Sequence, residues 1–141
     1  MLESRSEQAS WERERERQLR AARELACEVA RIADDFRAEN VVVLDLSRLT
    51  PIVDFFVIAS GTNPRQLRAI ADEVGRVLKE RGTVPLGVED DTTGQWVLHD
   101  YGDVVLHLFS PEARELYALE DLWADATAVD WRSDGEFPGA E

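Results

Sequence analysis

Hydrophobic and polar positions follow two periods along this chain, and the changes of period predict its elements. Between Leu25 and Phe36 the apolar residues recur three and four positions apart, which predicts a helix over residues 12–37. Two continuous apolar runs follow, at 41–46 and 54–60. Their β-branched and aromatic residues are typical of strands in the middle of a sheet. The first half is therefore predicted to form one helix and two buried strands.

The second half has clearer boundary signals. A helix is expected after the capping candidates Thr62 and Asn63, with Pro64 at its first position and Gly82 just past its end. A short strand over 83–88 contains a proline, which favours an edge position or a strand start. The remaining elements are a hairpin and a last helix that begins with a capping serine and a proline: residues 95–100, 103–109 and Ser110-Pro111 onward.

The order of these elements is α-β-β-α-β-β-β-α. A helix between strands predicts one crossover, and the hairpin supplies an antiparallel pair. We therefore predict a mixed α/β fold with a five-stranded sheet and helices mainly on one face. Residues 12–124 are expected to form this single domain. Residues 1–11 and the acidic residues 125–141 lack a periodic pattern, and we expect them to be disordered.

The hairpin contains most of the candidate chemistry. We expect Tyr101-Gly102 to be its two-residue turn. Because side chains alternate across a strand, each strand divides into two faces. One face of the second strand is aliphatic (Val104, Leu106, Leu108), the other mixes apolar and polar residues (Asp103, Val105, His107, Phe109), and Trp96, Leu98 and Asp100 share a face of the first strand. This division predicts a sheet that packs on helices on one side and presents the other side to a partner.

The last helix should contribute to the same region. Leu116, Leu119 and Trp123 are expected on its inner face, and Tyr117 at its edge with the hydroxyl outward. Trp96 has two interpretations, a core tryptophan or an anchor at an interface, where Trp, Tyr and Arg provide much of the binding energy.

Three other groups suggest chemistry more weakly. His99 and His107, with Asp100 and Asp103 nearby, could act in acid–base catalysis or hold a metal, but no nucleophile and no third ligand accompany them. The acidic loop 89–91 could collect a divalent cation, although such loops are usually only solvated. A nucleotide-binding enzyme or regulator is the alternative function, and it would use the strand-to-helix turn Ser60–Asn63, where backbone amides can bind an anion.

Charge narrows the class of partner. The formal net charge is −13, and the acidic excess is greatest in residues 112–141. Such a chain is a poor binder of nucleic acid, which requires a basic patch, and a good binder of basic proteins. The single cysteine, Cys27, excludes an internal disulfide and is expected to be exposed. No signal peptide or apolar run of membrane-spanning length is visible, so we expect a cytoplasmic protein.

Two segments resemble one known family. Gly-Gln-Trp-Val-Leu-His-Asp-Tyr-Gly-Asp-Val-Val-Leu-His, from Gly94 to His107, and Pro-Glu-Ala-Arg-Glu-Leu-Tyr-Ala-Leu-Glu-Asp-Leu-Trp, from Pro111 to Trp123, resemble the ribosomal silencing factor family, also called RsfS, YbeB or Iojap-like. The resemblance extends from about Ala22 to Trp123 and leaves both ends of the chain outside it.

The resemblance implies a function and a fold. The family binds the large ribosomal subunit through ribosomal protein fourteen, blocks joining with the small subunit and lowers translation when nutrients are scarce. Its fold resembles nucleotidyltransferases, it is not known as an enzyme, and its members often form homodimers. No cofactor, metal or catalytic residue is implied. The strand 104–109 also lacks the carboxylates with which a nucleotidyltransferase would hold metal.

The family pattern also implies the partner-binding residues of this chain. We expect Trp96 and Tyr117 to lie in the ribosomal contact, whereas some of the others only hold the hairpin and helix together. The residues that match the pattern are Trp96, Asp100, Gly102, Asp103, His107, Arg114 and Tyr117.

Overall fold

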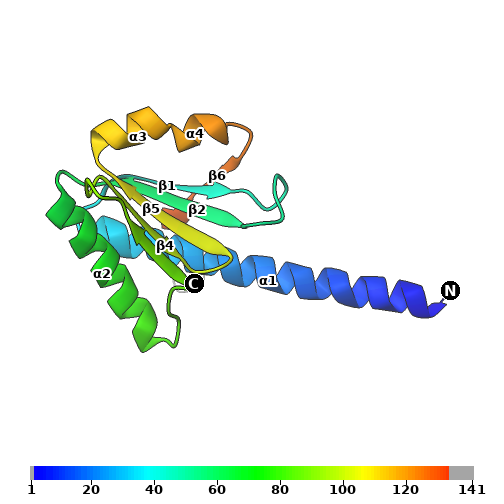
Figure 1. Cartoon of the computed structure of the whole chain (residues 1–141). Coiled ribbons are helices and arrows are strands. Elements are labelled where there is room, and N and C mark those ends of the chain that lie inside the picture. Colours follow the sequence, from blue (N-terminus) through cyan, green and yellow to red (C-terminus); the bar gives the residue numbers. More distant parts are fainter. Residues whose placement is uncertain (1, 134–141) are drawn as a thin grey trace.

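The computed structural model describes residues 2–133, and Figure 1 shows a twisted sheet between two layers of helices. The elements in chain order are α1 (Leu2–Asp35), β1 (Glu39–Asp45), β2 (Phe55–Ser60), α2 (Pro64–Glu80), β3 (Gly87–Asp90), β4 (Trp96–Asp100), β5 (Val104–Phe109), α3 (Pro111–Tyr117), α4 (Leu119–Leu122) and β6 (Thr127–Val129).

The six strands form one mixed sheet in the order β3-β4-β5-β2-β1-β6. The β2–β5 pair is parallel and every other pair is antiparallel. The parallel pair lies in the middle of the sheet, and its strands are joined through α2, β3 and β4. The predicted mixed sheet is confirmed. The predicted count of five strands is wrong, because β6 pairs with β1.

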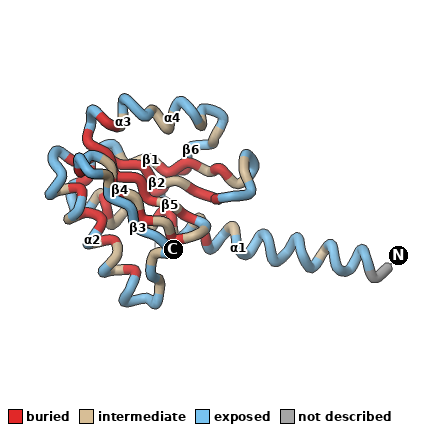
Figure 2. Tube along the Cα trace, viewed as in Figure 1, coloured by how far each residue is buried: buried red, intermediate tan, exposed pale blue. Residues whose placement is uncertain are grey.

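Helices cover both faces of the sheet, but the two long helices, α1 and α2, lie on one face and only the short α3 and α4 on the other, which agrees with the predicted helices mainly on one face. One core joins α1 and α2 to side chains such as Val57 and Leu106, and a second core joins α3 and α4 to Ile58 and Phe109. The reason is the continuous apolar sequence of the central strands, which is typical of strands covered on both faces. Figure 2 shows buried residues along most of β2 and β5.

The ends of α2 agree with the sequence signals. The side chain of Asn63 accepts the backbone N–H of Gln66, and Pro64 occupies the first turn. Gly82 follows the helix with φ of 85°, the left-handed conformation that glycine adopts most easily. Asn63 and Pro64 fix where the helix begins after β2, and Gly82 marks where it ends.

Helix α1 begins at Leu2, not at Glu12, so the expectation of disorder over residues 1–11 is wrong for the described part. The N-terminal part of α1 projects beyond the sheet (Figure 1). Alternating Glu and Arg allow ion pairs three positions apart, such as Arg17 with Glu14, which support an exposed helix. Closer to the domain, Arg15 donates to the buried carboxylate of Asp54 at 2.8 Å. We call residues 2–14, which precede this contact, the arm.

Cys27 is buried, with 2% of its surface exposed, which corrects the expectation of an exposed thiol. Helix α1 packs against α2 as well as against the sheet. A second packing partner buries a wider arc of the helix than the single apolar stripe in the sequence predicts.

The segment after Asp125 is partly structured, which corrects the expectation of a disordered tail. Residues 127–129 form β6, and Trp131 is buried. The indole N–H of Trp131 donates to the carbonyl of Val41 at 3.1 Å, and Arg31 donates to the carbonyl of Trp131 at 3.3 Å. Val129 and Trp131, two positions apart, thus extend the core beyond β1. The expectation for residues 134–141 lies outside the described residues.

The last helix is broken at Ala118, which adopts φ 48° and ψ 48°. This left-handed residue ends α3, and α4 starts immediately after it. Leu116, in α3 before the break, is 76% exposed, so its predicted inward position is wrong. Leu119 and Trp123 pack on the sheet as predicted.

Candidate partner-binding face

The hairpin turn lies one residue later than predicted. Asp100 pairs with Val105, and the N–H of Tyr101 donates to the carbonyl of Val104 at 2.8 Å, so the turn residues are Gly102 and Asp103. Gly102 has φ of 92° and Asp103 has no positive φ, which matches a type II′ turn with glycine at the first central position. Tyr101 is buried and closes the ladder.

The predicted residues of this turn act mainly through the backbone. The Asp100 carboxylate accepts the N–H of Gly102 at 2.8 Å. The carbonyl of Asp103 accepts the N–H groups of Asp54 and Phe55 at 2.9 and 3.0 Å. These bonds shape the turn and fasten it to the start of β2. Of the three predicted residues, only Asp103 is exposed.

Trp96, His107 and Tyr117 are brought together at the other end of the hairpin. The indole of Trp96 packs with two aromatic rings that also contact each other: its centroid lies 4.7 Å from Tyr117 and 5.0 Å from Phe109, and those two rings are 6.0 Å apart. Its N–H donates to Nδ1 of His107 at 3.2 Å. Trp96 is half-buried and Tyr117 is 47% exposed, so the cluster reaches the surface.

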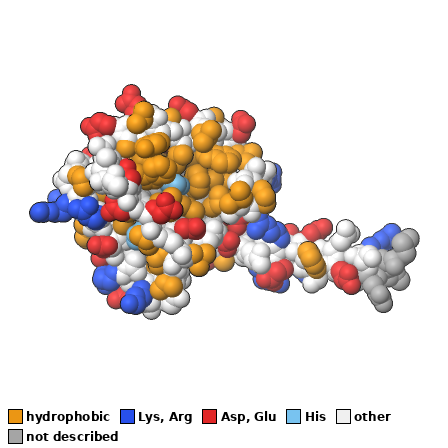
Figure 3. Space-filling view, in the orientation of Figure 1, with side chains coloured by type: hydrophobic (Ala, Val, Ile, Leu, Met, Phe, Trp, Pro, Cys, Tyr) orange, Lys and Arg blue, Asp and Glu red, His pale blue; other side chains and the backbone are white. Residues whose placement is uncertain are grey.

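Half-buried apolar side chains continue from this cluster across the sheet. The ring of Phe56 meets His107 edge-on at 4.5 Å and Trp123 at 6.2 Å. We call this surface the aromatic face; its members are Phe56, Trp96, Leu98, Val105, Tyr117 and Trp123. Figure 3 shows a broad apolar area on this side of the molecule, with acidic side chains at its margin. Exposed apolar areas are typical of interaction sites, so the aromatic face is a candidate for partner binding.

Phe56 was not identified from the sequence as a site residue. The run 54–60 is apolar at nearly every position, so it contains no alternation that assigns a residue to a face. The register of β2 with β5 places Phe56 beside Val105. Only this non-local pairing puts Phe56 next to the hairpin.

The two histidines lie on opposite faces and do not form a pair. His107 pairs with Leu98 across the ladder, whereas His99 pairs with Leu106 of the aliphatic face. His99 Nδ1 lies 3.3 Å from the hydroxyl of Tyr101. Burial raises the pKa of Tyr101 to about 12 and lowers the pKa of His99. The acid–base pair considered from the sequence is therefore not assembled.

Burial also lowers the pKa of His107, from 6.5 to about 4. Between pH 4 and 6.5, the His107 ring is therefore protonated in the unfolded chain and mostly neutral in the folded protein. We expect the free energy of unfolding to fall by about 3 kcal/mol as the pH drops from 6.5 to 4. Urea denaturation across this range measures the effect. His107→Phe should flatten the slope between pH 6.5 and 5, and an unchanged slope would contradict the assignment.

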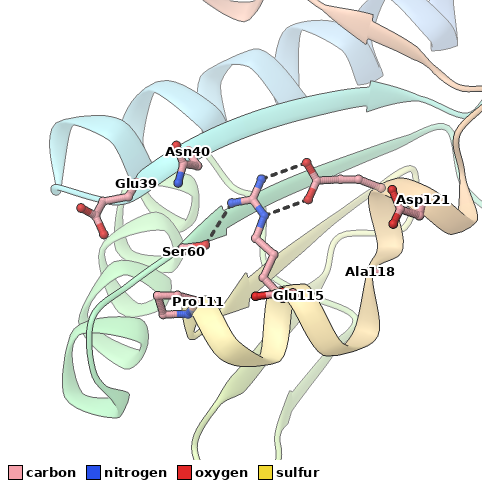
Figure 4. A pocket seen from close by; sticks show the side chains of 9 residues that line it. Glu39, Asn40, Ser60, Pro111, Glu115, Ala118 and Asp121 are labelled. Atoms are coloured by element: carbon pink, nitrogen blue, oxygen red, sulfur yellow. Dashed lines mark hydrogen bonds and ion pairs between the residues drawn. The ribbon is translucent and has the colours of Figure 1, made fainter.

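Arg114 lines the pocket drawn in Figure 4, together with Ser60 and Glu120. Its guanidinium binds both carboxylate oxygens of Glu120, at 2.8 and 3.1 Å, and donates to Ser60 Oγ at 3.0 Å. These contacts connect α3 to α4 across the break at Ala118 and hold α3 on the end of β2. Arg114 thus positions α3, while Tyr117 of the same helix reaches the aromatic face.

A cavity of about 390 Å³ lies beside Arg114, and its lining includes Ser60, the first residue of the turn for which the sequence suggested nucleotide binding. Its lining repels phosphate, because four carboxylates outnumber one guanidinium: Glu39, Glu115, Glu120 and Asp121 against Arg114.

The backbone amides of this turn are also already bonded. The N–H of Gly61 donates to the carbonyl of Phe109 at 3.0 Å, and the N–H of Thr62 donates to the side chain of Gln66. A Cβ at Gly61 would meet the side chain of Leu67 at 2.7 Å, so close helix packing explains this glycine. The geometry does not favour a nucleotide here.

Among residues 2–133, no three His, Cys, Asp or Glu side chains are grouped as a metal site would require. In the acidic loop after β3, the carboxylate of Asp91 accepts the Gln95 N–H at 2.9 Å and the Thr93 hydroxyl at 3.0 Å. This loop shapes its own turn. No helix in the described part of the chain is long and apolar enough to span a bilayer.

The fold and its exposed surface define a mixed α/β domain with a candidate partner-binding face on its sheet. Residues 19–139 match the family model described as ribosomal silencing factor during starvation. The ribosomal silencing factor RsfS of Halalkalibacterium halodurans is 42% identical over 97 residues, which cover 69% of this chain and 83% of that protein. The chain therefore belongs to the ribosomal silencing factor family, which is named for regulation and not for a reaction.

Two further similarities agree with this assignment. The crystal structure of a protein from Chromobacterium violaceum superposes with a TM-score of 0.66 at 36% identity, covering 75% of this chain and 86% of that one. A mouse protein named mitochondrial assembly of ribosomal large subunit protein 1 is 35% identical over 89 residues, 61% of this chain and 39% of its own length.

Proposed function

We propose that this protein binds the large ribosomal subunit through ribosomal protein fourteen and prevents the small subunit from joining. Translation then falls when nutrients are scarce. The observation that supports this most directly is the aromatic face, an apolar surface on a chain of the ribosomal silencing factor family. The name of the mouse relative points to the large subunit as the binding partner.

The composition of the aromatic face suits a protein partner. Tryptophan and tyrosine supply a disproportionate share of binding energy in protein interfaces. Trp96 and Tyr117 lie in contact at the surface, and α3 and α4 add exposed Leu116 and Leu122. We infer that Trp96 and Tyr117 are the central contacts.

The other matched residues are assigned supporting roles within this proposal. Asp100 and Gly102 hold the hairpin turn, and Arg114 holds α3. Asp103 is exposed and available to a basic partner.

Charge supports the same proposal. The net charge of −13 complements a basic ribosomal protein, and complementary fields speed the encounter of two proteins. The action is steric and involves no reaction. We further propose that the protein acts in the cytoplasm and forms a homodimer when it is not bound to ribosomes. The relation of its fold to nucleotidyltransferases stays a prediction.

Sedimentation of mixed ribosomal subunits tests the function. Large subunits preincubated with excess protein should fail to form whole ribosomes with small subunits, and the protein should migrate with the large subunit. An unrelated acidic protein at the same concentration is the control. Normal joining in the presence of excess protein would refute the proposal.

A further inference from the structure

The imidazole of His107 has one hydrogen-bond partner among the described residues, and that partner is Trp96. Nδ1 of His107 accepts the indole N–H at 3.2 Å, and Nε2 is buried without any hydrogen bond. The ring is otherwise surrounded by aromatic groups, edge-on to Phe56 and parallel to Phe109. Only 5% of the residue is exposed.

This contact fixes the state of the imidazole. The indole N–H can only donate, so Nδ1 must be an unprotonated acceptor, and the neutral ring has its proton on Nε2. That second N–H then lies in apolar surroundings with no acceptor. A buried donor without a partner is unfavourable for the fold, and an apolar ring of similar size would avoid the cost.

His107 therefore provides a hydrogen-bond acceptor for Trp96, which a phenylalanine at this position could not provide. Ring contacts with Tyr117 and Phe109 restrict the position of the indole, but such contacts tolerate a range of angles. A hydrogen bond is directional and fixes the rotation of the indole in its plane.

We propose that His107 is a positioning residue that holds the Trp96 indole in the orientation in which the ribosomal partner meets it. This inference rests on the proposed function, because it assigns a task to a buried residue of the same face. His107 stays beneath the surface and does not touch the partner. It reduces the conformational freedom that Trp96 would otherwise lose on binding.

Two substitutions separate positioning from packing. His107→Phe keeps an aromatic ring and removes the acceptor, whereas His107→Asn can place an oxygen near Nδ1. We expect His107→Phe to bind large ribosomal subunits about tenfold more weakly while its unfolding midpoint in urea is unchanged or higher. His107→Asn should recover most of the binding although its unfolding midpoint is lower. If phenylalanine overpacks the site, His107→Leu makes the same comparison.

The indole proton supplies a readout that is independent of the ribosome. In ¹⁵N NMR spectra, the Nε1–H signal of Trp96, assigned by its loss in Trp96→Phe, should exchange with water faster in His107→Phe than in the wild type. In a Trp96→Phe background, His107→Phe should have no further effect on binding, because the coupled group is absent.

Each outcome of these measurements is decisive. Wild-type affinity in His107→Phe, or a loss of binding that is matched by a loss of stability and not recovered by His107→Asn, would overturn the proposal. Unchanged indole exchange in His107→Phe would overturn it as well. If the wild-type protein does not bind large subunits, the proposed function fails, and the exchange measurement still decides whether His107 holds Trp96.

Discussion

Trp96→Ala should weaken binding to the large ribosomal subunit by roughly 30-fold to 1,000-fold, the range expected for a tryptophan at the centre of an interface. The side chain packs against both Tyr117 and Phe109, with part of its surface exposed. Truncation removes a partly exposed indole from the aromatic face and leaves Tyr117 with Phe109 as its ring neighbour. The loss should appear mainly as faster dissociation from the subunit.

Binding of labelled protein to purified large subunits, followed by fluorescence anisotropy, measures this loss. Trp11→Ala is a matched control, because Trp11 is 78% exposed on the arm, away from the sheet. It removes the same side chain and should leave the affinity unchanged. Wild-type affinity in Trp96→Ala, with the fold intact by circular dichroism, would mean that Trp96 is only a core residue.

Trp131→Ala should destabilise the protein by about 3–5 kcal/mol, the usual cost of replacing a buried tryptophan by alanine. Trp131 is only 7% exposed and donates its indole N–H to the carbonyl of Val41. Its loss leaves a cavity beside β1 and an unpaired carbonyl on that strand. For a domain whose total stability is about 5–15 kcal/mol, this is a large fraction.

Urea denaturation followed by circular dichroism measures this effect. Trp11→Ala again serves as the control, because an exposed tryptophan can be removed at little cost. A change below about 1 kcal/mol in Trp131→Ala would show that the C-terminal segment contributes little to the fold.

Local signals predicted much of this structure. Asn63, Pro64 and Gly82 mark the ends of α2 because capping depends on residues near each other in sequence. The alternation of β5 also assigned Val104 and His107 to opposite faces correctly. Caps and alternation are set by local backbone geometry, so they do not depend on contacts with distant parts of the chain.

The remaining features depend on contacts between distant segments. The three residues of β6 are too few for a recognisable pattern, and the strand forms because β1 offers a free edge. Cys27 is buried in a core that α1 shares with α2 and the sheet, which lie far away in the sequence. The break at Ala118 occurs without a glycine, so the sequence contains no signal for it. The ion pair of Arg114 with Glu120 spans this break.

The candidate site divides in the same way. Trp96, His107 and Tyr117 were identified from their motif, and the structure places them in contact. The separation of Arg114 from this cluster, and the presence of Phe56 in it, follow from the packing of α3 and from the β2–β5 register. Neither can be obtained from one strand or helix alone.

The arm also gives the molecule a built-in spacer. Beyond the contact of Arg15 with Asp54, residues 2–14 extend about 20 Å as a helix, at 1.5 Å per residue. Helix α1 packs on the face of the sheet opposite α3, so the arm does not start from the aromatic face. A fluorophore attached near the N-terminus would be held at a distance from the docking surface by a single continuous helix. Energy transfer from such a dye to a labelled ribosome would therefore report the orientation of the whole domain.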